Sequence, residues 1–291
     1  MSAEARLRFY AGVFDTVEVN ASYYAIPDVR NVVRWVERTP PGFLFHVKAY
    51  AVLTGHHVRA KALPADVEAL LPAAPARTRR GDIAASAFPP EAVEAAFRLF
   101  RAALRPLAEA GRLGYVLFQF APWVRFAPRW LDYLGGLPER LPGWRLAVEF
   151  RDRSWFPDHA AETLATLRRT GLGHVVVDAP ATPNAIPRVP VATTPTSVFR
   201  LHGRSAEGWL RQLRGEEPSV REKYDYLYAE AELREIATEA EALRAETDEV
   251  FVSFNNNNRD YPVRNALMMK RLLGQSAPPE RVNSLPPDLF A

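Results

Sequence analysis

The 291-residue chain contains no cysteine. Disulfide bonds, and zinc or iron–sulfur centres with cysteine ligands, are therefore excluded, and the absence fits a reducing compartment. No apolar run approaches the roughly 20 residues that a membrane-spanning helix needs. The first twelve residues also lack the apolar core of a signal peptide. We therefore expect a cytoplasmic protein with no membrane partner.

Glycine-rich phosphate loops are also missing. No GxGxxG or GxxxxGK[ST] motif follows any apolar segment, which argues against a dinucleotide-binding fold. The net charge is only +3, and the arginines are scattered, whereas nucleic-acid binders group them on one face. The charge is therefore weak support for a nucleic-acid partner. With 48% apolar and 24% charged residues, the composition is that of a folded soluble protein.

Seven short segments have the pattern of β-strands and alternate with helical segments. Some alternate polar and apolar residues, and others are almost wholly apolar, as in a buried parallel sheet. The predicted strands lie near residues 16–20, 43–49, 114–120, 145–151, 174–179, 197–203 and 249–255. The main predicted helices span residues 28–38, 90–109, 128–140, 157–170, 224–245 and 263–273. Asp28 is expected to cap the first of these helices, and Gly171 to end the fourth.

Alternating strands and helices predict a parallel sheet with helices outside it. Almost every predicted strand ends in polar residues, which meet at one mouth only if the sheet closes into a barrel. We therefore predict an α/β fold of the TIM (β/α)8-like barrel type with about seven strands present. A single domain is expected over residues 1–275, with an inserted segment at about 50–90 and a Pro-rich tail at 276–291.

Several sequence blocks, in one order, resemble the YecE-like family known as domain of unknown function 72. The resemblance spans residues 9–274, and it implies a TIM barrel whose reaction is not established. The blocks are FDTVEVNASYY at Phe14–Tyr24, PPGFLFHVKA at Pro40–Ala49, LFQF at Leu117–Phe120, AVEFRDRSWF at Ala147–Phe156, VVVDAP at Val175–Pro180, FRLHGR at Phe199–Arg204 and the Asn-rich end of the last strand.

The chain departs from the family pattern at its beginning. Members of the family normally start with a strand of the Gly-Thr-Ser-Gly-Trp type, some tens of residues before the FDTVE block. We therefore expect the first barrel strand to be missing here. Either the true start lies upstream, or the barrel is open between the strands near 16–20 and 249–255, which leaves two strand edges unpaired.

Acidic and imidazole side chains at the strand ends are candidates for proton transfer. Glu149 shares a strand face with Arg151, which gives an acid beside a cation or, equally, a buried ion pair that holds the barrel. His202 lies between Arg200 and Arg204, whose charges would lower the imidazole pKa and hold a phosphate or carboxylate. A strand histidine is also often a hydrogen-bonded core residue. The predicted catalytic set is Glu18, Glu149, Asp178 and His202.

Other polar and aromatic residues near the strand ends are candidates for substrate contacts. Lys48 suits a Schiff base or phosphate binding, or an ion pair with Glu18. Aromatic rings could stack on a sugar or a base, or pack the loops. The Asn-rich segment could hold hydroxyl or phosphate groups through its amides, or form a turn. The predicted substrate-binding residues are Asn20, Tyr23, His46, Lys48, Gln119, Arg151, Trp155, Arg200, Arg204, Asn255 and Asn257.

These residues predict an enzyme that applies acid–base chemistry, hydrolytic or isomerising, to a small anionic substrate, either phosphorylated or sugar-like. A variant is a metal-dependent phosphodiesterase or endonuclease acting on nucleic acid, because the carboxylates and imidazole of the catalytic set suit magnesium, manganese or zinc. No HxH, HxxxH or HExxH spacing supports such a metal site, and His56 and His57 lack partners at ligand spacing. A second hypothesis is a ligand-binding protein without turnover. The sequence specifies no cofactor and no oligomeric state.

Overall fold

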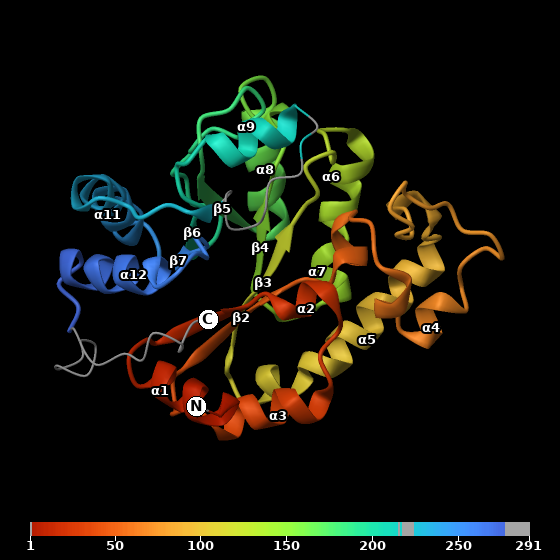
Figure 1. The fold of residues 1–291 in the computed structure, drawn as a ribbon, viewed down its shortest axis with the longest axis horizontal. Helices are drawn as coiled ribbons and strands as arrows, with labels where there is room; N and C mark the ends of the chain where they lie inside the picture. The colour runs from red at the N-terminus through yellow and green to blue at the C-terminus, as the bar shows by residue number, and fades with distance from the viewer. Residues whose placement is uncertain (1, 215, 217–223, 277–291) are drawn as a thin grey trace. The chain divides into compact units, whose positions relative to one another are not determined.

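The computed structural model describes residues 2–214, 216 and 224–276. They belong to two compact units, Ser2–Arg151 and Asp152–Ala291, which we call the N-terminal and the C-terminal unit. Figure 1 shows the order of their elements along the chain. The predicted Pro-rich tail lies, from residue 277 onward, outside the described residues. No helix in the described part of the chain is both long enough and apolar enough to cross a membrane.

The N-terminal unit contains four parallel strands that pair in sequence order. They are β1 (Thr16–Val19), β2 (Leu44–Lys48), β3 (Leu113–Gln119) and β4 (Leu146–Glu149). The helices are α1 (Ala3–Ala11), α2 (Ala21–Tyr24), α3 (Val29–Glu37), α4 (Ala65–Glu68), α5 (Pro90–Glu109), α6 (Pro128–Gly135) and α7 (Leu137–Arg140). Short 3₁₀ turns η1 (Ala51–Thr54), η2 (Ala60–Ala62) and η3 (Ala85–Ala87) lie with α4 in the segment predicted as an insert.

Helices α3 and α5 cover one face of these strands. α3 begins at Asp28, as predicted, where the carboxylate accepts a hydrogen bond of 2.8 Å from the backbone N–H of Arg30. Trp35 of α3 stacks on Phe45 of β2, with ring centroids 5.8 Å apart. α5 packs against α3 and its apolar side is buried. The face that contains Phe45 is therefore the helix-covered face, and the opposite face is left for polar residues.

Two features of the N-terminal unit differ from the expectation. The helix predicted over 128–140 is two helices, α6 and α7. Pro138 falls in the first turn of α7, where it lacks the N–H that one continuous helix would need, so the helix breaks at Gly136. Helix α1, which precedes β1, was not predicted. Residues 2–15 contain no strand.

The C-terminal unit contains three parallel strands, β5 (Gly173–Asp178), β6 (Thr196–Leu201) and β7 (Glu249–Phe254). Its helices are α8 (Ala160–Thr170), α9 (Glu207–Leu213), α11 (Glu230–Arg244) and α12 (Tyr261–Leu272), with the 3₁₀ turn η4 (Arg153–Trp155). Val176, Phe199 and Leu201 pack in one buried cluster with apolar residues of α11 and α12. α8 ends at Gly171, as predicted, in the left-handed conformation with φ 68°.

All seven predicted strands are present, but the strand predicted over 197–203 is shorter than expected. β6 ends at Leu201, and Gly203 adopts φ 87°. Alternation along the predicted strand would place Arg200, His202 and Arg204 on one face, but this turn takes Arg204 off the strand, so that expectation is wrong for Arg204. The helix predicted from residue 224 begins at Glu230 instead. Helix α9 was not predicted.

Candidate functional site

Polar side chains at the ends of the first four strands share one face of the N-terminal unit. Residues that pair in register in a parallel sheet point to the same side. Glu18 pairs with His46, and Gln119 pairs with Glu149. Lys48 pairs with Leu117. Residues two positions apart in a strand point to the same side, so Lys48 lies on the side of His46, and Leu117 on the side of Gln119. All five side chains therefore lie on the face opposite to α3 and α5, which in a TIM barrel is the interior face.

Loop contacts hold further groups at the same strand ends. The hydroxyl of Ser22 in α2 lies 2.8 Å from the last carbonyl oxygen of β1 and 2.6 Å from that of β2. The backbone N–H of Ala121, just after β3, donates to the carbonyl of Thr54 in the loop after β2 at 3.1 Å. The indole N–H of Trp123 donates to the carbonyl of Gly55 at 3.0 Å. These bonds tie the loops after β2 and β3 together.

Two small groups of side chains lie at the strand ends, and we call them together the N-terminal polar cluster: Tyr23, Lys48 and His56 form one, and Glu149 and Arg151 the other. Glu149 is fully buried and forms an ion pair with Arg151, with Oε1 2.8 Å from Nη1. The Nζ atom of Lys48 lies 4.6 Å from the centre of the Tyr23 ring. The same ring meets His56 edge-on at 5.0 Å. The charge of Arg151 also acts on His56, which links the two groups.

The charges around His56 are positive. Burial is the largest cause that lowers the pKa of His56 to about 3, followed by the charges of Lys48 and Arg151. His56 is therefore neutral at pH 7. Two cations from the ends of β2 and β4 therefore both act on this imidazole.

On β6 and β7 of the C-terminal unit, the face opposite the helices contains a hydrogen-bonded histidine. Asn257 donates through Nδ2 to Oδ1 of Asn255 at 3.0 Å, and Nδ2 of Asn255 lies 2.9 Å from Nδ1 of His202. An amide nitrogen only donates, so Nδ1 of His202 accepts and the proton of the neutral ring lies on Nε2. His202 and Arg200, two positions before it, are both fully buried.

Asp178 lies on the other side of the same sheet. It pairs in register with Leu201, whose side chain packs against the helices, so it points away from His202. Arg204 binds both its oxygens, at 2.8 Å to Oδ1 and 3.0 Å to Oδ2, and Arg188 binds Oδ1 at 2.9 Å. The hydroxyl of Tyr228 donates to Oδ2 at 2.6 Å. Burial opposes ionisation of Asp178, but these partners outweigh it and hold the pKa below its usual value.

The whole chain matches one protein family. The family model described as "Protein of unknown function DUF72" matches residues 1–288. The chain belongs to the DUF72 family. It is 33% identical to the UPF0759 protein YunF of Bacillus subtilis (strain 168) over 276 residues, which is 94% of this chain and 88% of YunF.

Solved DUF72 structures have the same fold as this chain. A DUF72 protein of Thermotoga maritima MSB8 is 32% identical, with a TM-score of 0.73 over 94% of this chain and 91% of that one. A DUF72 protein of Enterococcus faecalis V583 is 26% identical, with a TM-score of 0.75 over 95% and 96% of the two chains. The predicted family is confirmed. The fold class is α/β and TIM-barrel-like, and the described residues form seven parallel strands, one fewer than the eight of a TIM barrel.

Three predicted site residues of this DUF72 chain lie where the protein packs tightly. His46 is 2% exposed and stacks on Tyr115 at 3.9 Å, and burial lowers its pKa to about 3, with a smaller contribution from the charge of Arg145. Trp155 is fully buried, so its ring packs in the core and does not line a solvent-open site. Arg204 is engaged by Asp178 and by Glu232 at 3.0 Å. Their functional roles stay predictions, and these contacts favour structural ones.

The family chain also has aromatic and imidazole groups near the site that were not predicted as site residues. The sequence pattern shows His56 and His57 only without metal partners at ligand spacing, and it assigns no role to Trp123. His57 stacks on the indole of Trp123 at 4.6 Å, and Trp123 is 50% exposed. All three lie in loops after strands, and only the loop hydrogen bonds bring them to the strand ends. The two adjacent histidines in the predicted insert are the sequence signal for this part of the site, because long loops over a barrel often contain functional residues.

The metal variant finds no support in the described residues. No three of the His, Asp or Glu side chains in residues 2–214, 216 and 224–276 are grouped so as to hold a metal ion. Asp178 and His202, two members of the proposed set, point to opposite sides of their strands.

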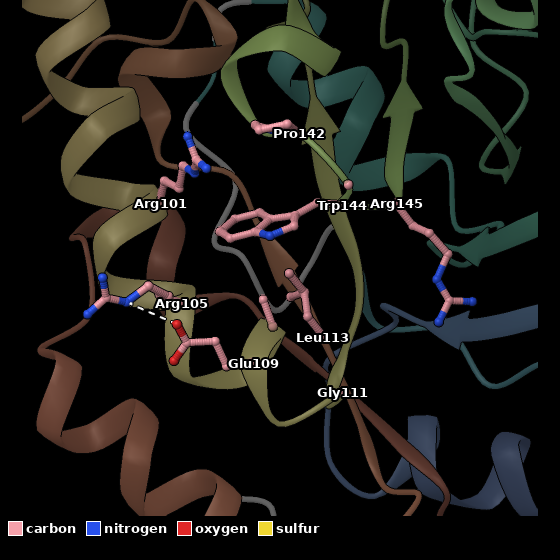
Figure 2. A pocket seen from close by; sticks show the side chains of 10 residues that line it. Arg101, Arg105, Glu109, Gly111, Leu113, Pro142, Trp144 and Arg145 are labelled. Carbon is pink, nitrogen blue, oxygen red and sulfur yellow. Dashed lines mark ion pairs between the residues drawn. The ribbon is translucent and has the colours of Figure 1, made fainter.

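A separate groove lies at the other end of the strands. It has a volume of about 580 Å³ and is lined by residues from the end of α5, the start of β3 and the turn before β4. Figure 2 shows Arg101 and Trp144 pointing into it, while Arg105 turns to Glu109 and Arg145 points away. In TIM barrels this end serves stability and the opposite end chemistry, so the N-terminal polar cluster is the better candidate site.

Proposed function

We propose that this DUF72 protein is an enzyme that applies acid–base chemistry to a small anionic substrate at the ends of β1–β4. The observation that carries the proposal is the approach of two cations, Lys48 and Arg151, to one group that also contains the buried carboxylate of Glu149. Cationic side chains at the ends of neighbouring strands favour phosphate or carboxylate groups.

Each residue has a separate role in this proposal. Lys48 and Arg151 bind the anionic group of the substrate, Lys48 as a point charge and Arg151 through its planar fork. Glu149 transfers the proton, because its ion pair with Arg151 loosens when the substrate takes a share of the Arg151 hydrogen bonds. The proposal assigns no role to His202, which stays a predicted proton-transfer group of the C-terminal unit; the Asn255 amide fixes its tautomer with the proton on Nε2.

Binding is tested first. Wild-type protein is titrated with inorganic phosphate and a panel of phosphorylated small molecules by calorimetry. Lys48→Met should weaken binding roughly 10- to 100-fold, the loss of one charge-assisted hydrogen bond. Lys61→Met, which removes an exposed lysine of the same unit, should leave binding unchanged. If no phosphorylated compound binds, or if both variants behave alike, the proposed anion site is wrong.

Turnover separates an enzyme from a ligand-binding protein. Compounds that bind are incubated with wild-type protein and followed by ³¹P NMR. Glu149→Gln should abolish product formation and keep binding, because glutamine preserves the shape but transfers no proton. Glu109→Gln, at the opposite strand ends, is the matched control. Binding without turnover in the wild type would favour the ligand-binding hypothesis, and full turnover in Glu149→Gln would contradict the role of Glu149.

A further inference from the structure

Trp123 is a large aromatic side chain that is both exposed and held in place. Half of its surface meets solvent, at 50%. Its indole N–H is bound to the carbonyl of Gly55 at 3.0 Å, and the ring of His57 lies nearly parallel to it, at 16° and 4.6 Å. His57 is fixed in turn, because its Nδ1 accepts a hydrogen bond of 3.0 Å from the backbone N–H of Ala85.

This arrangement makes the indole a pre-ordered stacking surface. An exposed tryptophan on a mobile loop would lose conformational freedom when a ligand stacks on it. Trp123 has little conformational freedom left to lose, because the hydrogen bond and the stacked imidazole restrict both the position and the tilt of the ring. One face is covered by His57, and the exposed part of the indole remains for another ring.

The surface is joined to the cations of the N-terminal polar cluster by short contacts. The ring of Trp123 lies 5.8 Å from that of His56, and His56 lies 5.0 Å from Tyr23. The Nζ atom of Lys48 is 4.6 Å from the Tyr23 ring. These contacts form a continuous path from the indole of Trp123 to the ammonium group of Lys48.

We propose that the substrate is a phosphorylated ring compound, a mononucleotide or a sugar phosphate, whose ring stacks on Trp123 while its phosphate lies at Lys48 and Arg151. This proposal rests on the proposed anion site and adds the ring. Aromatic side chains stack on nucleobases whatever their sequence, and indole faces also pack on the apolar face of a pyranose. The feature common to both ligands is a flat or nearly flat ring beside a phosphate.

The test compares ligands with and without a ring by calorimetry. The ringless probes are inorganic phosphate and glycerol phosphate, and the ring-bearing probes are nucleoside 5′-monophosphates and hexose 6-phosphates. Wild-type protein should bind at least one ring-bearing probe more tightly than both ringless probes. Trp123→Leu should weaken that probe roughly 5- to 150-fold, as expected for the loss of one stacked ring, and leave inorganic phosphate unchanged. Trp123→Phe should restore part of the loss, and Trp144→Leu, in the groove at the opposite strand ends, should change nothing.

The outcomes separate the two proposals. A preference for nucleotides identifies a base as the ring, and a preference for hexose phosphates identifies a sugar, and either supports the proposal. Phosphate binding that depends on Lys48 but shows no ring preference overturns the ring and keeps the anion site. Equal losses for inorganic phosphate and ring-bearing probes in Trp123→Leu also overturn it, because Trp123 would then act only through the loop structure. No binding of any probe overturns both proposals.

Discussion

Acidification from pH 7 to pH 5 should destabilise this protein through three buried histidines. Burial is the main cause that lowers the pKa of His46 and of His56 to about 3. It also lowers the pKa of His174 to about 4, although a hydrogen bond to the carbonyl of Val189 partly opposes it. In the unfolded chain each imidazole has a pKa near 6.5. Because the folded pKa is the lower one, the stabilising contribution is complete above about pH 6.5 and is lost as the pH falls toward 4 and then 3.

The magnitude follows from the linkage between proton binding and folding. Between pH 7 and pH 5 each of these histidines lowers the free energy of unfolding by about 2 kcal/mol, so the three together remove roughly 5–6 kcal/mol. That loss is comparable to the whole stability of a typical domain, about 5–15 kcal/mol. At pH 5, unfolding should take up nearly three protons at these sites. The pKa of Asp178 lies below its usual value, so this carboxylate adds to the loss only at lower pH.

Urea denaturation at pH 7, 6 and 5 measures the loss, and the imidazole resonances of His46, His56 and His174 show its source. In the folded protein these resonances should not titrate down to pH 5. Because burial dominates, 1 M salt should leave the pH dependence nearly unchanged. A pH slope that corresponds to fewer than one proton, or folded-state titration of these histidines near pH 6.5, would refute the reasoning.

Two further substitutions test the packing of the C-terminal unit. Gly203→Ala should destabilise by more than the roughly 1 kcal/mol of left-handed strain, because the added Cβ would lie 2.7 Å from Cβ of Tyr226. Gly81→Ala, also left-handed but in open space, should show the strain alone, and equal losses in urea denaturation would contradict this account. Asp178→Asn should cost about 2–3 kcal/mol because it weakens the charge-assisted hydrogen bonds that the buried carboxylate accepts from Arg204, Arg188 and Tyr228, and a loss under 1 kcal/mol would show that the network is not stabilising.

The fold could be predicted because strand and helix patterns are local. Each of the seven predicted strands has an observed counterpart within about two residues at either end. The caps at Asp28 and Gly171 also follow from local chemistry, a side-chain acceptor in one case and a left-handed backbone in the other. Helix α6 ends where a proline interrupts the pattern, which the apolar periodicity alone does not reveal.

The composition of the site depended on long-range geometry. Asp178 and His202 are both polar residues at strand ends, but register places them on opposite sides of one sheet. Strand parity also fails for Arg204, because Gly203 turns the chain before it. His56 and Trp123 reach the strand ends only through hydrogen bonds between separate loops, which no local pattern encodes.

The most direct test of the anion site follows the imidazole of His56 by NMR while inorganic phosphate is added. Its pKa is about 3, lowered first by burial and then by the charges of Lys48 and Arg151. A phosphate held by these two cations would lie near the imidazole, so the ring resonances of His56 should shift at pH 7 as phosphate is added. This shift should be lost in Lys48→Met and kept in Lys61→Met. Saturation with phosphate that leaves the His56 resonances unchanged, or an equal shift in Lys48→Met, would contradict the account.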